Sequence, residues 1–379
     1  MFATSGATFF SIISYHYAGI CTIKFGILTK NDFGGATMGN SLLKMHKRTF
    51  IISSGSVVGQ KEKHGPLGKY FDLSGDDRFG KDTWEKSEAE MQRLSLGIAL
   101  RKAELKSDID VIFAGDLINQ CISSSYGLLE YKFPFLGLFG ACSTCSEGLL
   151  MAAVYASTVC NRCAAVTSSH FCSAERQFRY PLEYGGQRPP TSQWTVTGAG
   201  AFVVSSDTND ILRNRSKFVP EIVEVMPGKI VDRGISDANN MGAAMAPSAA
   251  DTLERFFALG HTPDEFDLIV TGDLGREGSA ILRDLLSAKG IDISKNHVDC
   301  GNMIFSPESS DTHAGGSGCG CSAVVMSADI LENVKNGKLS DILFLGTGAL
   351  MNPMSVSQGQ TIPGIAHLVH IKGISVERV

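Results

Sequence analysis

The sequence lacks the long apolar run that a membrane span requires. Its most apolar early stretch, T-F-F-S-I-I-S-Y-H-Y-A-G-I-C-T-I, covers residues 8–23 and contains His16. A transmembrane helix needs about 20 consecutive apolar residues, and the basic residues that open a secretory signal peptide are missing here. Two explanations of residues 1–37 stay open: either translation begins at Met38, or the segment has a membrane or targeting role. We expect no bilayer-spanning helix elsewhere in the chain.

The chain also lacks an excess of charge of either sign. Lys and Arg number 34 and Asp and Glu 39, which gives a net charge of −5 and a pI near 6.0. No basic stripe is present, so a nucleic-acid-binding protein is excluded. With 43% apolar residues in 379, the composition is that of a globular protein with one large or two medium domains.

Cysteine is too dilute for a disulfide framework. Ten cysteines are spread over 379 residues, many of them in apolar segments rich in Gly and Ala, which predicts reduced thiols. The pairs Cys142-x2-Cys145 and Cys160-x2-Cys163 have a spacing known from zinc sites. However, the segment between them is typical of a helix, which would hold the pairs roughly 20 Å apart. Zinc ligands must all lie close to one ion, so we expect no metal site.

A repeated pattern divides the chain into two similar halves. The sequence D-x-I-x-x-G-D-L occurs at residues 110–117 and again at 267–274, each time as a short buried strand that ends at a turn. In each half a helical run and another buried strand follow in the same order. The helices are expected at 146–159 and 319–332, and the strands at 163–168 and 341–346. This order predicts a duplicated α/β unit.

The polar stretch 205–217 is the expected boundary between the halves. We therefore expect an N-terminal half at 45–212 and a C-terminal half at 213–379. Strands that are apolar throughout, rather than alternating, predict mostly parallel sheets covered by helices on both faces. The two central helices are unusually small and apolar, which indicates five layers in the order αβαβα.

The stretch F-G-A-C-S-T-C-S-E-G, residues 139–148, places Cys142 in a tight turn between an expected strand at 134–139 and the first central helix. A helix N-terminus offers free N–H groups and positive potential. Such a setting lowers a thiol pKa and can hold an anion. The alternative is a small buried cysteine that only packs, and this interpretation is favoured for Cys145, Cys319 and Cys321.

These features resemble the thiolase superfamily, and most closely its β-ketoacyl-ACP synthase branch. The shared motifs are G-A-C-S before a helix, T-G-A-G-A-F-V-V closing the first half, and G-T-G-A-L near the C-terminus, and the match covers nearly all of residues 48–379. The resemblance implies the five-layered thiolase-like fold and a homodimer in which strand 197–205 pairs across the interface. It also implies acyl transfer or Claisen condensation from Cys142.

The catalytic partners that this resemblance requires are missing. In the condensing branch, a histidine follows the first strand of the second half, and an asparagine lies in the Gly-rich turn before the later helix. By register, the histidine position falls at Gly272 or Asp273 and the asparagine position at Gly316. The nearest histidines in sequence, His297 and His313, are expected to be surface or core residues. Each missing element costs roughly 10²–10⁴ in rate, so we expect a pocket without its catalytic machinery.

A segment rich in arginine and aromatic residues follows the strand at 163–168. It spans residues 167–190 and contains Arg176, Arg179 and Arg188 together with Phe178, Tyr180 and Tyr184. Ligands of α/β proteins bind at the carboxyl ends of the strands, and guanidinium groups pair with carboxylates. The segment therefore suits a planar dianion. The alternative is a dimer-interface excursion whose arginines pair with Glu175 and Glu183, and both can be true.

Together with four further motifs, this segment resembles the SpoVAD (stage V sporulation protein AD) family of endospore-forming bacteria. The motifs are G-Q-K-E-K-H-G-P-L-G-K-Y-F-D at 59–72, A-G-D-L-I-N-Q at 114–120, M-G-A-A-M-A-P-S-A-A-D-T at 241–252 and T-I-P-G-I-A-H at 361–367. The resemblance implies a thiolase-fold protein that binds dipicolinic acid (pyridine-2,6-dicarboxylate) or its calcium chelate. It also implies a peripheral place on the cytoplasmic side of the inner spore membrane. There the protein would act with the other SpoVA membrane proteins, which move this compound in sporulation and germination.

We therefore expect a non-catalytic ligand-binding subunit, and the alternative is an acyltransferase or condensing enzyme that uses Cys142. One carboxylate of dipicolinate would lie at the helix N-terminus, and an arginine would hold the other, since one helix N-terminus can serve only one of them. No cofactor is expected. The candidate ligand-binding residues are Cys142, Ser143, His170, Arg176, Arg179, Gly272 and Gly316.

Overall fold

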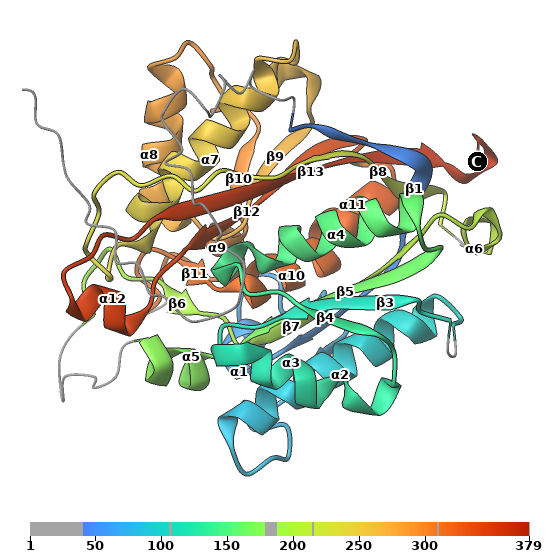
Figure 1. Ribbon diagram of the computed structural model, residues 1–379, viewed down its shortest axis with the longest axis horizontal. Coiled ribbons are helices and arrows are strands. Elements are labelled where there is room, and N and C mark those ends of the chain that lie inside the picture. The colour runs from blue at the N-terminus through green and yellow to red at the C-terminus, as the bar shows by residue number, and fades with distance from the viewer. Residues whose placement is uncertain (1–40, 106–107, 179–187, 214–215, 309–310, 379) are drawn as a thin grey trace, which may run out of the picture. The chain divides into compact units, whose positions relative to one another are not determined.

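The computed structural model describes residues 41–378 except four short internal segments, 106–107, 179–187, 214–215 and 309–310 (Figure 1). Ser41–Val379 form one compact unit. The segment 1–37 lies outside the described residues, and so do Arg179, Tyr180 and Tyr184 of the arginine-rich segment.

The two halves of the chain form sheets with the same strand topology. In the first half the strands lie in the order β4-β3-β5-β7-β1, and in the second half in the order β10-β9-β12-β13-β8. In both, the first three strands of this order are parallel, and the last two pair antiparallel with their neighbours. The first-half strands are β1 (Leu43–Val58), β3 (Val111–Gly115), β4 (Phe135–Gly137), β5 (Arg162–Ser169) and β7 (Gly198–Ser205). The second-half strands are β8 (Phe218–Met226), β9 (Leu268–Thr271), β10 (His297–Asp299), β12 (Asp341–Ala349) and β13 (Gly364–Ser375).

Strand β1 joins the two sheets into one continuous hydrogen-bonded surface. Its first residues pair with β8, where Leu43 lies opposite Val225. The remainder pairs with β7, from Phe50 opposite Ser205 to Val58 opposite Gly198. The ladder with β8 shifts register between Lys44 and Thr49 and continues to Phe50, which pairs with Glu221 of β8 and with Ser205 of β7. The two sheets therefore overlap at this residue of β1.

Helices form three layers around the two sheets (Figure 1). The outer layer of the first half contains α2 (Trp84–Lys102) and α3 (Ile122–Gly127), and that of the second half contains α7 (Met241–Phe257) and α8 (Gly275–Ser287). Between the sheets lie α4 (Thr144–Thr158) and a second helical segment made of α10 (Cys319–Val325), a π turn (Met326–Ile330) and α11 (Leu331–Lys335). The central core combines residues of both halves, for example Leu149 and Val325. The predicted duplicated, five-layered α/β architecture is confirmed.

The remaining elements are short and lie in connections. The helices are α1 (Gln60–Lys63), α5 (Phe171–Phe178), α6 (Thr208–Leu212), α9 (Cys300–Ile304) and α12 (Pro353–Ser357). The strands are β2 (Leu73–Ser74), β6 (Trp194–Thr195) and β11 (Gly316–Ser317). The 3₁₀ turns are Asn119–Cys121, Leu129–Tyr131, Ala141–Ser143, Pro263–Glu265 and Val376–Arg378. The last two of these strands, β6 of the first half and β11 of the second half, pair with each other in parallel.

One expectation about the dimer is wrong. Strand 197–205 corresponds to β7, and every residue of β7 pairs with β1 on one side and with β5 on the other. Because both edges of β7 are occupied, this strand cannot pair with a second copy of the chain. At the first-half end of the sheet the edge strand is β4.

Candidate functional site

Cys142 lies where the sequence places it, in the 3₁₀ turn Ala141–Ser143 between β4 and α4. Ala141 has a φ of 54°, a left-handed conformation that is uncommon for a residue with a side chain. This tight turn directs the Cys142 side chain into the interior, where the residue is only 6% exposed. The elbow therefore presents a thiol to a pocket rather than to the surface.

Two residues of the second half approach the Cys142 thiol. The Sγ atom lies 3.9 Å from Oγ of Ser317. Ser317 Oγ donates to Oδ2 of Asp273 at 3.1 Å, and the backbone N–H of Gly318 donates to the same oxygen at 2.8 Å. Thr347 Oγ1 donates to the other carboxylate oxygen at 2.9 Å. Asp273 is fully buried, so an acid with three hydrogen-bond donors stands beside the thiol.

This carboxylate reverses the predicted electrostatics of the elbow. The helix N-terminus predicted a lowered thiol pKa. Instead, burial and the neighbouring charge of Asp273 raise the pKa of Cys142 well above its ordinary value. Burial also raises the pKa of Asp273, to about 6, against the hydrogen bonds that favour its charged form. A buried thiol that faces an anion remains protonated at neutral pH, and the expectation of a lowered pKa is wrong.

A cavity of about 270 Å³ opens at this thiol. Its described walls come from both halves, and most are apolar, including Leu117, Phe139, Ala174, Phe178, Met241 and Met351. Glu175 is the one charged side chain among the described lining residues. Its Oε1 lies 3.6 Å from Nη1 of Arg188. The described part of the pocket therefore suits the apolar face of a ligand.

The glycines singled out by register lie next to the residues that approach the thiol. Of the two residues that register left open for the histidine position, Asp273 rather than Gly272 lies beside Cys142, and for the asparagine position Ser317 lies there rather than Gly316. A Cβ on Gly272 would meet the backbone of Thr347 at 3.1 Å, and a Cβ on Gly316 would meet Ile304 at 2.6 Å. Neither glycine belongs to the described lining of the cavity. Ser143 is buried as well, and its Oγ donates to Gly140 O at 2.6 Å within the turn.

His170 and Arg176 do not reach the pocket. One ring nitrogen of His170 lies 2.8 Å from the carbonyl of Asp77, and the other accepts from the N–H of Cys172 at 3.1 Å. Burial lowers the pKa of His170, so it is a neutral, structural histidine. Arg176 is largely exposed and pairs with Glu85. Both residues belong to the predicted segment, but the structure uses them to anchor α5.

Arg188 also has a structural position. Its guanidinium donates to the carbonyl of Gln193 and lies 5.3 Å from the ring of Trp194. Trp194 stacks on Phe171 with ring centroids 3.8 Å apart, and Nζ of Lys61 lies 4.1 Å from the Trp194 ring. This stack joins α1, α5 and β6 beside the pocket. Arg179 directly follows the pocket residue Phe178, but it lies outside the described residues.

Sequence reasoning missed the importance of the aspartate in each repeat of G-D-L. The repeat predicted two strands correctly, and it also contains Asp116 and Asp273 at equivalent strand ends. Both are fully buried, and each accepts from a side-chain hydroxyl and a backbone N–H, for Asp116 those of Ser124. A carboxylate repeated directly after a buried strand was a signal that could have been followed.

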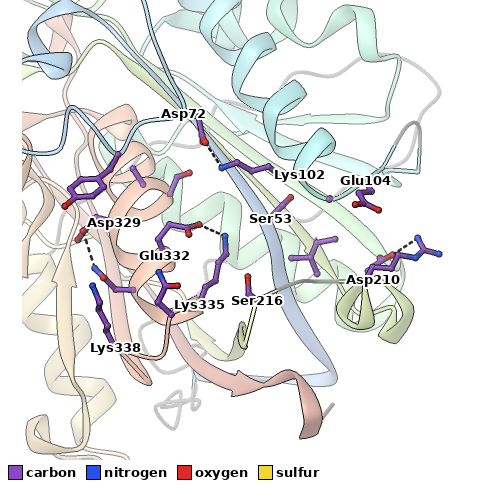
Figure 2. Close-up of a pocket in the computed structure, with 18 of the residues that line it drawn as sticks. Ser53, Asp72, Lys102, Glu104, Asp210, Ser216, Asp329, Glu332, Lys335 and Lys338 are labelled. Atoms are coloured by element: carbon purple, nitrogen blue, oxygen red, sulfur yellow. Dashed lines mark hydrogen bonds and ion pairs between the residues drawn. The ribbon is translucent and has the colours of Figure 1, made fainter.

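A second, larger cavity of about 770 Å³ lies where the ends of α2, α6 and α11 meet (Figure 2). Its walls carry charges of both signs, and most are paired with one another. Lys102 Nζ lies 2.6 Å from Asp72, and Lys335 Nζ lies 2.7 Å from Glu332. Because these pairs cancel, the cavity has no dominant sign of charge that would select an anionic or a cationic ligand.

Residues 41–378, outside the four gaps, contain neither a metal-binding cluster nor a membrane-spanning helix. The described part holds no group of three His, Cys, Asp or Glu side chains placed to bind a metal. Between the two cysteine pairs of zinc-like spacing, the chain forms α4 over residues 144–158. Among the same residues, no helix is both long enough and apolar enough to cross a membrane.

Comparison with solved structures defines the class of fold. The chain is similar to OleA of Xanthomonas campestris bound to cerulenin, with a TM-score of 0.56 at 13% identity over 88% of this chain and 98% of that one. It is similar to human mitochondrial 3-ketoacyl-CoA thiolase, with a TM-score of 0.54 at 9% identity over 87% and 99%. For 3-oxoacyl-(acyl-carrier-protein) synthase III of Aquifex aeolicus VF5, the TM-score is 0.50 at 14% identity over 86% and 99%. The protein therefore has a thiolase-like fold.

Sequence comparison narrows this class to one family. Residues 39–372 match the family described as stage V sporulation protein AD (SpoVAD). The stage V sporulation protein AD of Bacillus subtilis (strain 168) is 44% identical over 322 residues, which cover 84% of this chain and 92% of that protein. The chain belongs to the SpoVAD family, as its sequence motifs predicted.

Proposed function

We propose that this sporulation protein is a non-catalytic subunit that binds dipicolinic acid, or its calcium chelate, in the Cys142 pocket. One observation carries the non-catalytic part: an acid, Asp273, lies beside the thiol at the position where the condensing branch has a histidine. An anion beside a buried thiol disfavours the thiolate, which is the nucleophilic form. The ligand follows from the family resemblance, and the apolar walls of the pocket suit the face of its pyridine ring.

The charge of the ligand needs a cation that the described lining does not contain. Phe178 lines the cavity and Arg179 is the next residue, so we propose that Arg179 pairs with one carboxylate. The start of α4 serves the other. Arg176 pairs with Glu85 instead and would not contact the ligand. The sequence left both Arg176 and Arg179 as candidates, and this proposal selects Arg179.

Calorimetric titration with dipicolinate, with and without calcium, tests this binding. A charge-assisted contact contributes about 1.5–3 kcal/mol, so Arg179→Ala should weaken binding by roughly 10- to 150-fold. Arg176→Ala, three residues away, is the matched control and should bind like the wild type. Picolinate, which has one carboxylate, should bind more weakly than dipicolinate. Equal affinities for picolinate and dipicolinate would refute this account of the pocket.

The alternative function is acyl transfer from Cys142, and it predicts a covalent intermediate. Purified protein incubated with radiolabelled acyl-CoA should remain unlabelled if the subunit only binds its ligand. Label that is retained by the wild type and lost in Cys142→Ser would establish the enzyme and overturn the proposal.

Replacements of Cys142 show whether this residue only lines the pocket or also forms a covalent bond. Cys142→Ser keeps the size of the side chain, so we expect dipicolinate affinity and spore function to stay close to those of the wild type. Cys142→Trp adds an indole to a cavity of about 270 Å³, and we expect it to abolish binding. Thermal unfolding of both variants controls for misfolding. If Cys142→Ser binds ligand normally but fails in spores, the result would favour the alternative in which Cys142 forms a covalent intermediate.

We further propose that the protein is a homodimer. It would act on the cytoplasmic side of the inner spore membrane, with the other SpoVA membrane proteins as partners in moving dipicolinate. The edge strand β4 supports the dimer, because all three of its residues are exposed. The large apolar side chains Tyr126, Leu129 and Phe139 are exposed in the connections before and after it. Light scattering should give about twice the chain mass, and a monomer at micromolar concentration would exclude the dimer.

A further inference from the structure

Two carboxylates lie buried behind the Cys142 pocket without a compensating cation. Glu88 of α2 and Asp116, which follows β3, are both fully buried. Glu88 accepts from Ser168 Oγ at 2.8 Å and from Ser173 Oγ at 2.7 Å. Asp116 accepts from Ser124 Oγ at 2.6 Å and from two backbone N–H groups. No ion pair to either carboxylate is present in the described part of the chain, so these two acids have only hydroxyl and amide partners.

One amide links the two acids into a single network. The Nε2 group of Gln92 donates to Ser168 Oγ at 2.8 Å and to Ser124 Oγ at 2.9 Å. Ser168 then donates to Glu88, and Ser124 donates to Asp116. Since the two hydrogens of the amide are used in this way, neither serine can turn away without breaking the network. The two carboxylates are therefore fixed in one polar cluster inside the core.

This cluster holds two walls of the pocket. Ser173, which donates to Glu88, belongs to α5, the helix that supplies Ala174 and Phe178 to the cavity. Asp116 precedes Leu117, another lining residue. Gln177 ties the two walls together, because its Nε2 donates to the carbonyl of Leu117 at 2.8 Å.

The hydroxyl of Ser173 has two acceptors available. Besides Glu88, it lies 3.1 Å from the carbonyl of His170. When Glu88 carries a proton, its O–H can donate to Ser173 Oγ, and the Ser173 hydroxyl turns to His170. When that proton leaves to solvent, Ser173 must turn back to the carboxylate. The cluster then holds two buried negative charges, whose repulsion no cation offsets.

We propose that Glu88 and Asp116 share one proton, and that the pocket in front of them binds an anionic ligand well only while that proton is bound. The proposal rests on the proposed function for its ligand, whereas the titration of the two acids is a property of the protein alone. Loss of the proton adds negative charge behind the pocket and turns the Ser173 hydroxyl, in α5, from the carbonyl of His170 to the carboxylate of Glu88. An anionic ligand should therefore bind more weakly at high pH.

The electrostatics of the surroundings agree with this direction. Burial and the charge of Asp116 raise the pKa of Glu88 to about 8, and burial raises the pKa of Asp116. The other titratable groups around the cluster are Cys121, Cys319, His170, Glu175 and the surface pair Glu85–Arg176. Burial raises the pKa of both thiols and lowers that of His170, so these three do not lose a proton near pH 8.

Both tryptophans of the sequence lie close to the cluster, Trp84 one turn before Glu88 on α2 and Trp194 beside the start of α5. Trp194 stacks on Phe171 with ring centroids 3.8 Å apart, and Trp84 lies 5.3 Å from the ring of His170. Intrinsic fluorescence from pH 6.5 to 9.5, measured without ligand, should show a transition in the wild type. Glu88→Gln should abolish it, since the amide cannot ionise. Glu62→Gln is the matched control, because Glu62 is also fully buried with a pKa raised to about 8, by burial against its bond from Thr197.

Calorimetry with dipicolinate across the same pH range tests the link to the pocket. The affinity of the wild type should fall by about fivefold or more as pH rises, while Glu88→Gln should vary less than about twofold. A flat wild-type fluorescence profile, or a transition that survives in Glu88→Gln and disappears in Glu62→Gln, would overturn the proton-sharing pair. A fluorescence transition without any change in affinity would overturn its link to ligand binding. If dipicolinate does not bind at any pH, the proposed function fails, and fluorescence alone decides whether Glu88 loses a proton in this pH range.

Discussion

Cys142 and Asp273 come from different halves of the chain, and the buried carboxylate of Asp273 lies beside the thiol that lines the pocket. The thiol is delivered by an elbow that resembles those of condensing enzymes, but the partner side chain is an acid. Because the acid accepts from Ser317, Gly318 and Thr347, it is held in place and cannot turn away. The thiol is therefore kept in its neutral form by a fixed neighbour.

Removal of this charge should activate the thiol. In Asp273→Asn the carboxylate that raises the pKa of Cys142 is lost, so the thiolate fraction at a given pH increases. We expect alkylation of Cys142 by iodoacetamide, followed by peptide mass spectrometry, to be faster than in the wild type at pH 8. Asp329→Asn changes a half-buried aspartate elsewhere and should leave the rate unchanged. An unchanged rate in Asp273→Asn would mean that burial alone controls the thiol.

Some residues of the site could be predicted from the sequence and others could not. Cys142 was predictable because a strand, a Gly-rich turn and a helix surround it in sequence. Register left Gly272 or Asp273 at the histidine position, but it did not predict that the carboxylate of Asp273 approaches the thiol, since the contact depends on how two segments more than 100 residues apart are packed. The arginines were misjudged for a related reason: Arg176 finds Glu85 on α2, and no local pattern reveals such a partner.

At the scale of elements, three strands of the second half meet at one histidine. His370 of β13 lies 2.9 Å from Glu224 of β8 and 2.6 Å from Asp341 of β12, one carboxylate on each ring nitrogen. Burial by itself would lower the pKa of His370, but the hydrogen bonds and charges of the two carboxylates outweigh it and raise the pKa. The histidine is therefore a charged bridge between strands.

This bridge predicts a pH-dependent contribution to stability. The raised pKa means that the contribution is fully present below the unfolded value, near 6.5. It is lost as pH rises through the folded value. We expect His370→Gln to lower the free energy of unfolding by about 1.5–3 kcal/mol at pH 6 and by clearly less at pH 9. Urea unfolding at both pH values measures this difference, and a constant difference would contradict the bridge.

The edge strand β4 makes a second prediction at this scale. An exposed strand edge with unpaired backbone groups favours pairing with another strand. Leu136 is 43% exposed in the middle of β4, and Leu136→Arg should place a charge in the proposed dimer interface. We expect light scattering to shift from dimer toward monomer. Leu285→Arg, at an exposed leucine of α8, is the control and should leave the mass unchanged.

Elements were easier to predict from sequence than their roles in assembly. The apolar runs predicted β3, β5, β7, β9, β12 and the two central helices, because burial on both faces removes alternation from the pattern. The interior position of β7 was not predictable in this way, since a central strand and a dimer-edge strand can have the same apolar composition. Only the pairing of β7 with β1 and β5 excludes it from the interface.

At the scale of the whole molecule, each half supplies a central helix that packs against the sheet of the other half. Gly200 of β7, in the first half, faces Ala323 of α10, in the second half. Gly346 of β12, in the second half, faces Ser146 of α4, in the first half. A Cβ would lie 2.6 Å from Ala323 Cβ in the first case and 2.3 Å from Ser146 Oγ in the second. The duplicated unit is therefore interlocked, because each half contributes a central helix that packs against the strands of the other half.

This interlocking predicts that the two halves unfold together. Gly200→Ala or Gly346→Ala forces the central layer apart, which should cost about 1–3 kcal/mol. Gly148→Ala is the matched control in α4: its Cβ would meet Ala165 at 3.4 Å, an ordinary contact, and alanine favours a helix by up to about 1 kcal/mol. Both tryptophans lie in the first half, so their fluorescence reports on that half, whereas circular dichroism reports on the whole chain. In urea, the two probes should show one coincident transition, shifted to lower urea by Gly346→Ala. Two separate transitions would show that the halves are independent units.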